Sequence, residues 1–174
     1  MKRFGKADIV RLLGLLNDEL NADDVRGEVY LVGGAVMCLS FAARPSTRDL
    51  DAYFAPTSQV RKAAARVSTK AGVPEGWLND GVKGYLSSKG EFNVYLDLSH
   101  LKVFVADAEY LLAMKCLAMR LGEDFHDLDD VRYLLRNLGI ESYEQATKVI
   151  GKFYPLERFP QKTLYVLEEL LSSR

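Results

Sequence analysis

The residues best suited to chemistry are two aspartates, Asp49 and Asp51, in a D-x-D pair within a strand-like stretch. Alternate side chains of a strand point to the same face, so the two carboxylates lie about 6.6 Å apart along one face. Carboxylate oxygens at that spacing can converge on shared Mg²⁺ ions, which prefer oxygen ligands. Two metal ions there could activate an attacking hydroxyl and stabilise a departing pyrophosphate. The pair therefore indicates phosphoryl transfer, although many D-x-D pairs are merely solvated strand edges.

A Gly33-Gly34 pair precedes these aspartates and offers a place for phosphates. It follows a short β-rich run, Val29–Val32, and precedes a small-residue segment that the spacing predicts as a helix over 35–43. Such a turn presents backbone N–H groups with no side chain in the way, next to a helix N-terminus. Either motif alone is weak. The two motifs together are much less likely to arise by chance than either motif alone, because they occur in a fixed order: strand, Gly-Gly, helix, then a strand with D-x-D.

The elements that must position these residues follow from hydrophobic periodicity. The first half of the chain mixes helices with strands, and the last two strands form an antiparallel pair. The second half is helical. The predicted helices cover 7–20, 35–43, 57–71, 107–121, 124–137, 142–152 and 161–171, and the predicted strands cover 29–32, 49–54, 92–98 and 101–105. We therefore predict an α/β (α+β) fold: a mixed-sheet core over residues 1–106 and a C-terminal helical lobe over 107–174, packed as one compact unit with the active site between them.

Composition narrows the class of protein. The chain has 174 residues, 48% of them hydrophobic, which is enough for one globular domain and excludes a disordered segment. Its 23 basic and 24 acidic residues give a net charge of -1, which argues against coating nucleic acid by bulk charge. The two cysteines, Cys38 and Cys116, cannot form a four-ligand zinc site or a disulfide framework. With no export signal and no apolar run of about 20 residues, we expect a cytoplasmic protein without a membrane partner.

The combined motifs resemble the nucleotidyltransferase superfamily of the DNA polymerase β type, whose signature is a hydrophobic-Gly-Gly/Ser turn followed by a D-x-D pair. Thr47-Arg48-Asp49-Leu50-Asp51 looks like this second element. Downstream, the K-x-x-A-x-R pattern of residues 115–120 and the D-x-x-D pattern of residues 127–130 are similar to the AbiEii-like branch, which includes type IV toxins and the MenT group. The segment Trp77–Asp80 also resembles an element of a bacterial subgroup of that branch. The resemblance covers about Val29 to Leu135 and implies a nucleotidyltransferase-type sheet.

The resemblance implies roles for particular residues. Asp49 and Asp51 would be catalytic carboxylates that bind two Mg²⁺ ions. Gly33 and Gly34 would lie against the phosphates of an NTP. The nucleotide-binding residues would further include Lys115, Arg120, Asp127 and Asp130.

Several of these residues have simpler interpretations. Lys115 could be an ordinary helix-surface lysine, although it falls among the apolar residues of its helix. Asp127 and Asp130 could orient Lys115 or could simply favour a helix N-terminus. Arg120 could bind phosphate or form an ion pair.

A third metal-binding carboxylate is usual on a later strand of the superfamily. Asp97 is the best candidate because it ends a predicted strand and shares a face with Asn93 and Tyr95. Glu91 is the alternative.

Positive charge gathers between Ala52 and Pro74, where there is no acidic residue. Basic residues four apart share a helical face and could bind an RNA backbone, although such faces are more often solvated. Tyr and Phe are predicted at core positions rather than on a stacking platform. The candidate RNA-binding residues are Arg44, Arg48, Lys62, Arg66 and Lys70.

The resemblance implies Mg²⁺-dependent transfer of an NMP from an NTP to an acceptor hydroxyl. With a tRNA 3′ end as acceptor, the protein would be the toxin of a type IV-like pair, with an antitoxin as its partner. The alternatives are nucleotidylation of a small molecule or a protein side chain, and a non-catalytic binding module with the same fold.

Overall fold

A computed structural model describes residues 2–122 and 125–173. The chain divides into two compact units. The first comprises Met1–Gly84 and Phe92–Ala106, and the second comprises Tyr85–Glu91 and Asp107–Arg174. The segment Tyr85–Glu91 therefore belongs to the same unit as the C-terminal helices.

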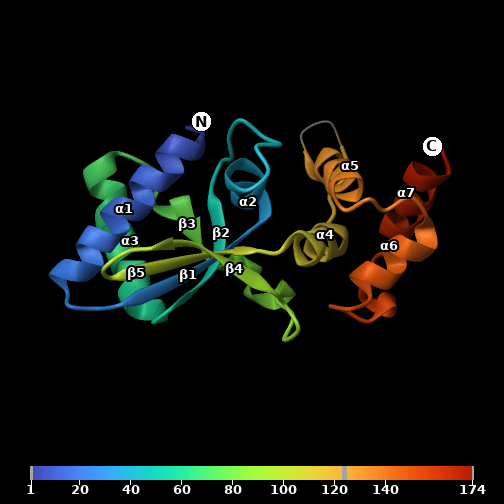
Figure 1. Ribbon diagram of the computed structural model, residues 1–174. Coiled ribbons are helices and arrows are strands. Elements are labelled where there is room, and N and C mark those ends of the chain that lie inside the picture. The colour runs from blue at the N-terminus through green and yellow to red at the C-terminus, as the bar shows by residue number, and fades with distance from the viewer. Residues whose placement is uncertain (1, 123–124, 174) are drawn as a thin grey trace. The chain divides into compact units, whose positions relative to one another are not determined.

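Within the described residues, the first unit contains one five-stranded sheet in the order β3-β2-β1-β5-β4 (Figure 1). Strand β1 pairs antiparallel with β2 and parallel with β5, while β3 lies parallel to β2. The predicted antiparallel pair, β4 and β5, is confirmed. The strands are β1 (Gly27–Val32), β2 (Leu50–Ala55), β3 (Leu78–Asn79), β4 (Phe92–Asp97) and β5 (Leu101–Ala106). This mixed sheet with helices confirms the predicted α/β class.

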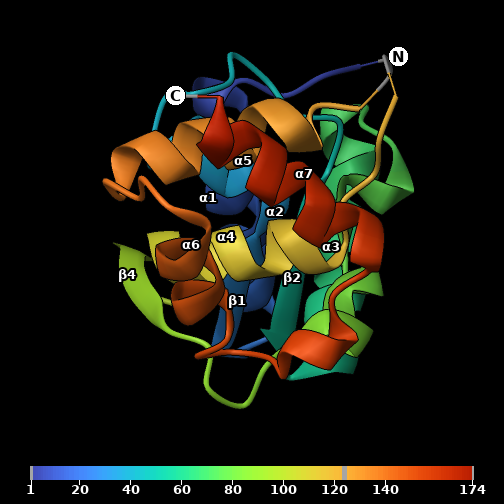
Figure 2. The same ribbon diagram turned by 90° about the vertical axis from the view of Figure 1, so that its right-hand side faces the viewer.

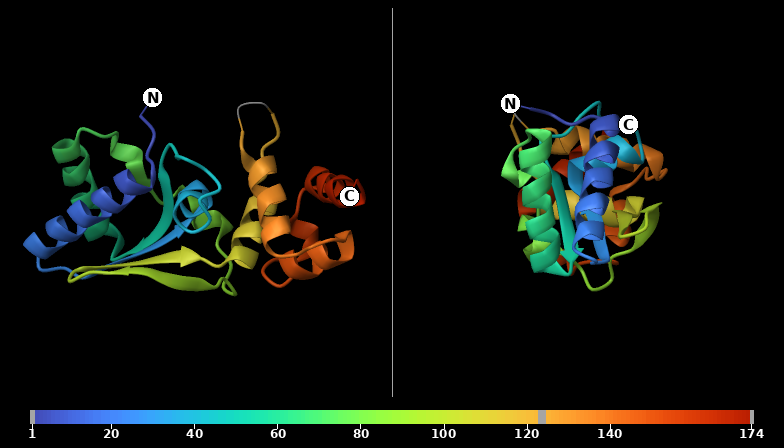
Figure 3. Two further views of the ribbon diagram at one scale, coloured as in Figure 1. Left: turned by 45° about the horizontal axis from the view of Figure 1, so that its top comes forward. Right: turned by 90° about the vertical axis from the view of Figure 1, so that its left-hand side faces the viewer.

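The helices of the first unit are α1 (Lys6–Ala22), α2 (Gly33–Leu39) and α3 (Thr57–Ala71), with short 3₁₀ turns η1 (Glu75–Trp77) and η2 (Gly81–Tyr85). These helices lie on one face of the sheet (Figures 1 and 3). The alternation predicted for β2 explains this arrangement, because its apolar residues Leu50, Ala52 and Phe54 are buried. Helix α1 contributes a stripe of buried leucines and Ile9 to the same core.

The second unit, with helices α4 to α7 labelled in Figure 2, is helical as predicted. Its elements are α4 (Ala108–Leu117), α5 (Asp127–Asn137), α6 (Tyr143–Ile150), η3 (Leu156–Arg158) and α7 (Gln161–Ser172). Helix α4 contacts both α5 and α6, and is therefore buried from Tyr110 to Leu117. Helix α5 begins at Asp127. Asp124, where we expected its start, lies outside the described residues.

None of the helices in the described chain is both long and apolar enough to cross a membrane.

Candidate active site

The Gly-Gly and D-x-D motifs lie side by side at one end of strands β1 and β2. Val32, the last residue of β1, is the register partner of Asp51. Gly33 follows directly, with φ +66°, and a Cβ there would lie 3.2 Å from Asp51 Oδ2. Only glycine adopts this backbone conformation readily, and only glycine leaves this space beside the carboxylate.

Gly34 is also enclosed. A Cβ at this position would lie 2.7 Å from a guanidinium nitrogen of Arg44 and 2.7 Å from Thr47 Oγ1. Thr47 is buried, and its hydroxyl donates to the Asp49 carbonyl at 3.1 Å. The loop between α2 and β2 therefore folds against Gly34 and fixes the backbone of Asp49. It also places Arg44, a predicted RNA-binding residue, next to the Gly-Gly pair.

Asp49 lies just before β2 and has a polar neighbour that the sequence did not reveal. Asn79 Nδ2 donates to Asp49 Oδ2 at 3.3 Å. Asn79 stands on β3, where it is the register partner of Asp51. A buried hydrogen bond from Trp77 Nε1 to the Ala64 carbonyl, 3.0 Å long, anchors the approach to β3. The segment Trp77–Asp80, singled out in the sequence, thus supports the D-x-D pair from the edge of the sheet.

The donor set suits a hard divalent cation. Asp49 and Asp51 are half-buried carboxylates at one end of β2, and Asn79 hydrogen-bonds to one of them. Mg²⁺ is commonly bound by one or two carboxylates, with water and substrate phosphate oxygens as further ligands. Among the described residues, no group of three or more His, Cys, Asp or Glu is placed to hold a metal ion. The suitability of this site for Mg²⁺ therefore depends on the two aspartates, Asp49 and Asp51.

The structure does not bring Asp97, the predicted third carboxylate, to the two aspartates, because the sheet register carries it to the other end. Asp97 on β4 pairs with Lys102 on β5, which pairs with Glu28 on β1. Glu28 in turn is opposite Ala55, the last residue of β2. Asp97 is therefore aligned about 13 Å along the strands from Asp51 and is three strands away. The alternative, Glu91, belongs to the second unit, where its carbonyl accepts from the Asp107 N–H at 2.9 Å.

The predicted basic ridge on α3 is largely neutralised. Arg66 Nε lies 2.7 Å from Glu19 Oε2, and its Nη2 lies 2.5 Å from Asp23 Oδ2. Lys70 also pairs with Glu19. These ion pairs join α3 to α1 and offset much of the positive charge that the sequence placed on this face. Lys62 and Arg48 are exposed.

Aromatic side chains gather on the sheet, contrary to the prediction that they would be scattered core residues. The Tyr30 ring has its centroid 5.8 Å from that of Tyr53, 5.2 Å from that of Phe92 and 4.4 Å from that of Phe104. Tyr30 also donates its hydroxyl to Glu28 at 2.7 Å, and burial raises the pKa of Tyr30 to about 12. The cluster stands on the face of β2 that carries Asp51, since Tyr53 is two residues further along.

In the second unit, the structure brings Lys115, Arg120, Asp127 and Asp130 together. The Lys115 ammonium is 9% exposed and lies 2.7 Å from Asp130 Oδ2 and 3.2 Å from Asp127 Oδ1. Arg120 donates to Asp127 Oδ2 from both its backbone N–H and its Nε, each at 3.0 Å. The interpretation of Lys115 as a surface lysine is therefore wrong.

Both interpretations of the acidic residues fit this geometry, since α5 begins at Asp127 and both carboxylates also hold Lys115. Burial alone would raise the pKa of Asp127. The Lys115 charge and the hydrogen bonds from Arg120 outweigh burial and hold that pKa below its ordinary value.

The chain matches no protein-family model, no curated protein and no solved structure.

Proposed function

We propose that this protein is a Mg²⁺-dependent nucleotidyltransferase of the DNA polymerase β type, which moves an NMP from an NTP to an acceptor hydroxyl. The observation that carries this proposal is the position of Asp51 beside Gly33, whose Cβ would lie 3.2 Å from the carboxylate. A carboxylate that holds metal and a backbone without side chains are the two parts that a triphosphate requires at the point of reaction.

The glycines and the aspartates would have different roles in this reaction. Gly33 and Gly34 let the backbone pass close to Asp51 and to the loop that carries Arg44 and Thr47, and their N–H groups would bind the phosphate oxygens. Asp49 and Asp51 would hold the metal ions, and Asn79 keeps the Asp49 carboxylate oriented through its hydrogen bond. Bound Mg²⁺ would supply charge neutralisation for the leaving pyrophosphate and activation of the acceptor hydroxyl.

The finer proposal is that the protein belongs to the AbiEii/MenT-like branch and acts on a tRNA 3′ end as a toxin with a cognate antitoxin. It is supported by the K-x-x-A-x-R and D-x-x-D patterns, whose Lys115, Arg120, Asp127 and Asp130 contact one another. In this branch Lys115 would contact the triphosphate, with the two aspartates holding its ammonium in place.

One observation favours a second acceptor class. Arg66 and Lys70 are engaged by Glu19, so the cationic surface for an RNA backbone is smaller than the sequence suggested. A small molecule or a protein side chain that presents a hydroxyl needs no such surface.

The test is transfer of label from each α-radiolabelled NTP, with Mg²⁺, to total RNA or to protein. We expect Asp49→Asn and Asp51→Asn to lower transfer by about 10²–10⁴-fold, because each removes a metal-binding carboxylate. Asp97→Asn is the matched control and should leave transfer unchanged, since Asp97 lies at the other end of the sheet. Undiminished transfer by Asp51→Asn would exclude this mechanism.

A further inference from the structure

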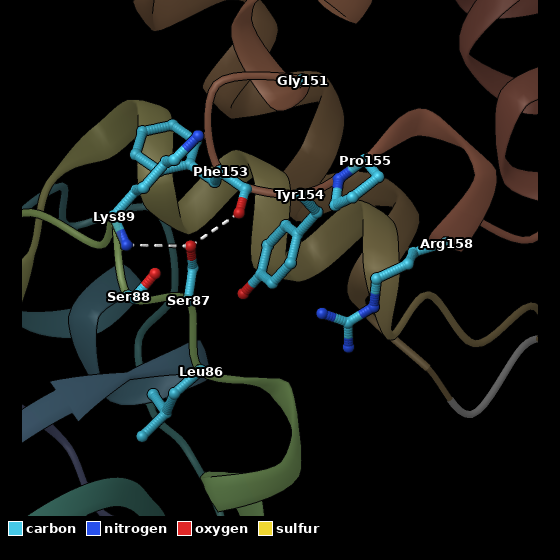
Figure 4. A pocket seen from close by; sticks show the side chains of 9 residues that line it. All are labelled: Leu86, Ser87, Ser88, Lys89, Gly151, Phe153, Tyr154, Pro155 and Arg158. Carbon is cyan, nitrogen blue, oxygen red and sulfur yellow. Dashed lines mark hydrogen bonds between the residues drawn. The ribbon is translucent and has the colours of Figure 1, made fainter.

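The second unit contains a pocket of about 620 Å³ that involves none of the residues discussed above as nucleotide-binding (Figure 4). One wall comes from the loop Tyr85–Glu91 and the other from the segment that follows α6. The lining residues are Leu86, Ser87, Ser88, Lys89, Gly151, Phe153, Tyr154, Pro155 and Arg158.

Hydrogen bonds hold the two walls together. Ser87 Oγ donates to the Phe153 carbonyl at 2.6 Å and accepts from the Lys89 N–H at 3.1 Å, as the dashed lines in Figure 4 show. The Tyr154 hydroxyl, on a side chain that is almost fully buried, donates to the Tyr85 carbonyl. The pocket is therefore formed before any ligand arrives, which reduces the entropy cost of binding.

Close packing at two glycines fixes the backbone of each wall. A Cβ at Gly90 would lie 2.4 Å from the Tyr110 ring, whose hydroxyl accepts from the Ser87 N–H at 3.0 Å. A Cβ at Gly151 would lie 2.8 Å from the Thr147 carbonyl oxygen. The loop is thus packed against Tyr110 of α4 at Ser87 and Gly90, and the pocket wall that it forms is part of the helical unit.

The pocket is positively charged. Lys89 and Arg158 line it on either side of Tyr154, and none of the lining residues is acidic (Figure 4). Within the described residues, neither cation lies within 4.0 Å of a carboxylate, whereas nearby Lys152 pairs with Glu109 at 2.7 Å. The Arg158 guanidinium lies 5.2 Å from the centre of the Tyr154 ring, a contact that positions the cation without neutralising its charge.

We propose that this pocket binds a phosphate group. The Arg158 guanidinium offers paired N–H donors that match phosphate oxygens, and the Lys89 ammonium adds a compact positive charge at the other side of the pocket. The Ser88 hydroxyl is a further donor at the rim. The phosphate could be carried by a free nucleotide or by a nucleic-acid backbone, since both present the same oxygens. This site stands apart from the proposed nucleotidyl transfer and does not depend on it.

The experiment is a titration of the ¹⁵N-labelled protein followed by NMR, with inorganic phosphate, AMP and a short single-stranded oligonucleotide without terminal phosphates as separate probes. At low salt we expect the largest shifts at Ser88, Lys89 and the Arg158 side chain. Lys89→Ala/Arg158→Ala should weaken binding at these positions at least tenfold, because both cations are lost. Tighter binding of AMP identifies a free nucleotide as the source, and tighter binding of the oligonucleotide identifies a nucleic-acid backbone; either result supports the proposal.

The matched control is Lys148→Ala/Lys162→Ala, which removes the same charge from exposed positions of the same unit that do not line the pocket. It should change the affinity less than twofold. An equal loss in both double variants would overturn the proposal, because the effect would then be one of overall charge. Absence of shifts at Ser88 and Lys89 up to about 10 mM of every probe would also overturn it, since a phosphate site of use to a cell binds in the millimolar range or tighter.

Discussion

At Gly33 the backbone has a positive φ and a carboxylate in the place that a side chain would occupy. Gly33→Ala should therefore lower the free energy of unfolding by about 1–2 kcal/mol, through left-handed backbone strain and contact with Asp51. Urea unfolding followed by circular dichroism measures this difference.

Gly14 provides the control for that prediction, because it lies inside α1 and a Cβ there would have no atom within 4 Å. Gly14→Ala should stabilise the protein by up to about 1 kcal/mol, as alanine favours a helix interior. Equal effects of the two variants would show that Gly33 is not constrained by its surroundings.

Lys115 contacts both Asp127 and Asp130. Lys115→Met would leave two buried carboxylates close together, and we expect it to destabilise the protein by about 3–5 kcal/mol. The measurement is urea unfolding followed by circular dichroism.

Arg132→Met on α5 is the comparison, because Arg132 forms an exposed ion pair with Asp129 at 3.4 Å. Exposed pairs contribute little, so its effect should stay within about 0.5 kcal/mol. If Lys115→Met were as mild as this control, the buried cluster would not be a structural requirement of the unit.

At the scale of elements, α3 is held to α1 by ion pairs that the sequence pattern concealed. Arg66→Ala should cost about 1–2 kcal/mol, because buried Glu19 would keep only its contact with Lys70. Thermal unfolding of the variant against Lys62→Ala, an exposed residue four positions earlier on the same helix, measures this difference. Equal melting temperatures would contradict a structural role for the Arg66 pairs.

Local periodicity predicted most elements, including α3 at Thr57–Ala71 and the β4–β5 pair, because each buries one face of a regular repeat. It missed β3, since two residues carry no period and Leu78–Asn79 is a strand only through pairing with β2. Periodicity could not predict how far Asp97 lies from Asp51, because it does not reveal the strand order, in which β5 lies between β1 and β4. The Gly-Gly and D-x-D motifs were brought together as expected, since consecutive strands commonly pair.

The partners of charged residues were harder to predict from the sequence than the elements. The sequence pattern predicts Arg66 as an RNA-binding residue, because it does not show that Glu19, 47 positions away, lies beside it. The sequence left Lys115 as either a triphosphate ligand or a surface lysine, and only the packing of α5 on α4 places it beside Asp127 and Asp130. Such pairs depend on tertiary packing, which no local repeat encodes.

For the molecule as a whole, acid should unfold the first unit partly through Glu19. Hydrogen bonds from Lys70 and Arg66 hold the pKa of Glu19 below its ordinary value of 4.5. A carboxyl with a lowered pKa stabilises the fold above its ordinary value, and this contribution fades as the pH falls from about 4.5 through the folded-state pKa. Glu19→Gln should therefore lower stability at pH 7 and reduce its dependence on pH below about 4.5.

Trp77 makes this measurable, because it is the single tryptophan of the chain and is buried in the first unit. Urea unfolding followed by its fluorescence at pH 7 and at pH 3.5 gives the two stabilities. Glu75→Gln, at an exposed carboxyl of the same unit, should leave the pH dependence of the natural protein intact. A pH dependence that survives Glu19→Gln unchanged would assign acid unfolding to other groups.

The loop Tyr85–Glu91 departs from the first unit, joins the helical one and returns before β4. The backbone therefore crosses between the units three times, at 84–85, 91–92 and 106–107. A protease cut at any one of these crossings leaves the units covalently joined through the others. A chimera that exchanges the helical unit by a single splice after Ala106 would leave behind the loop that contains Ser87, and with it a wall of the phosphate pocket. The helical unit is therefore not one continuous segment of the chain, and a single recombination event cannot transfer all of it.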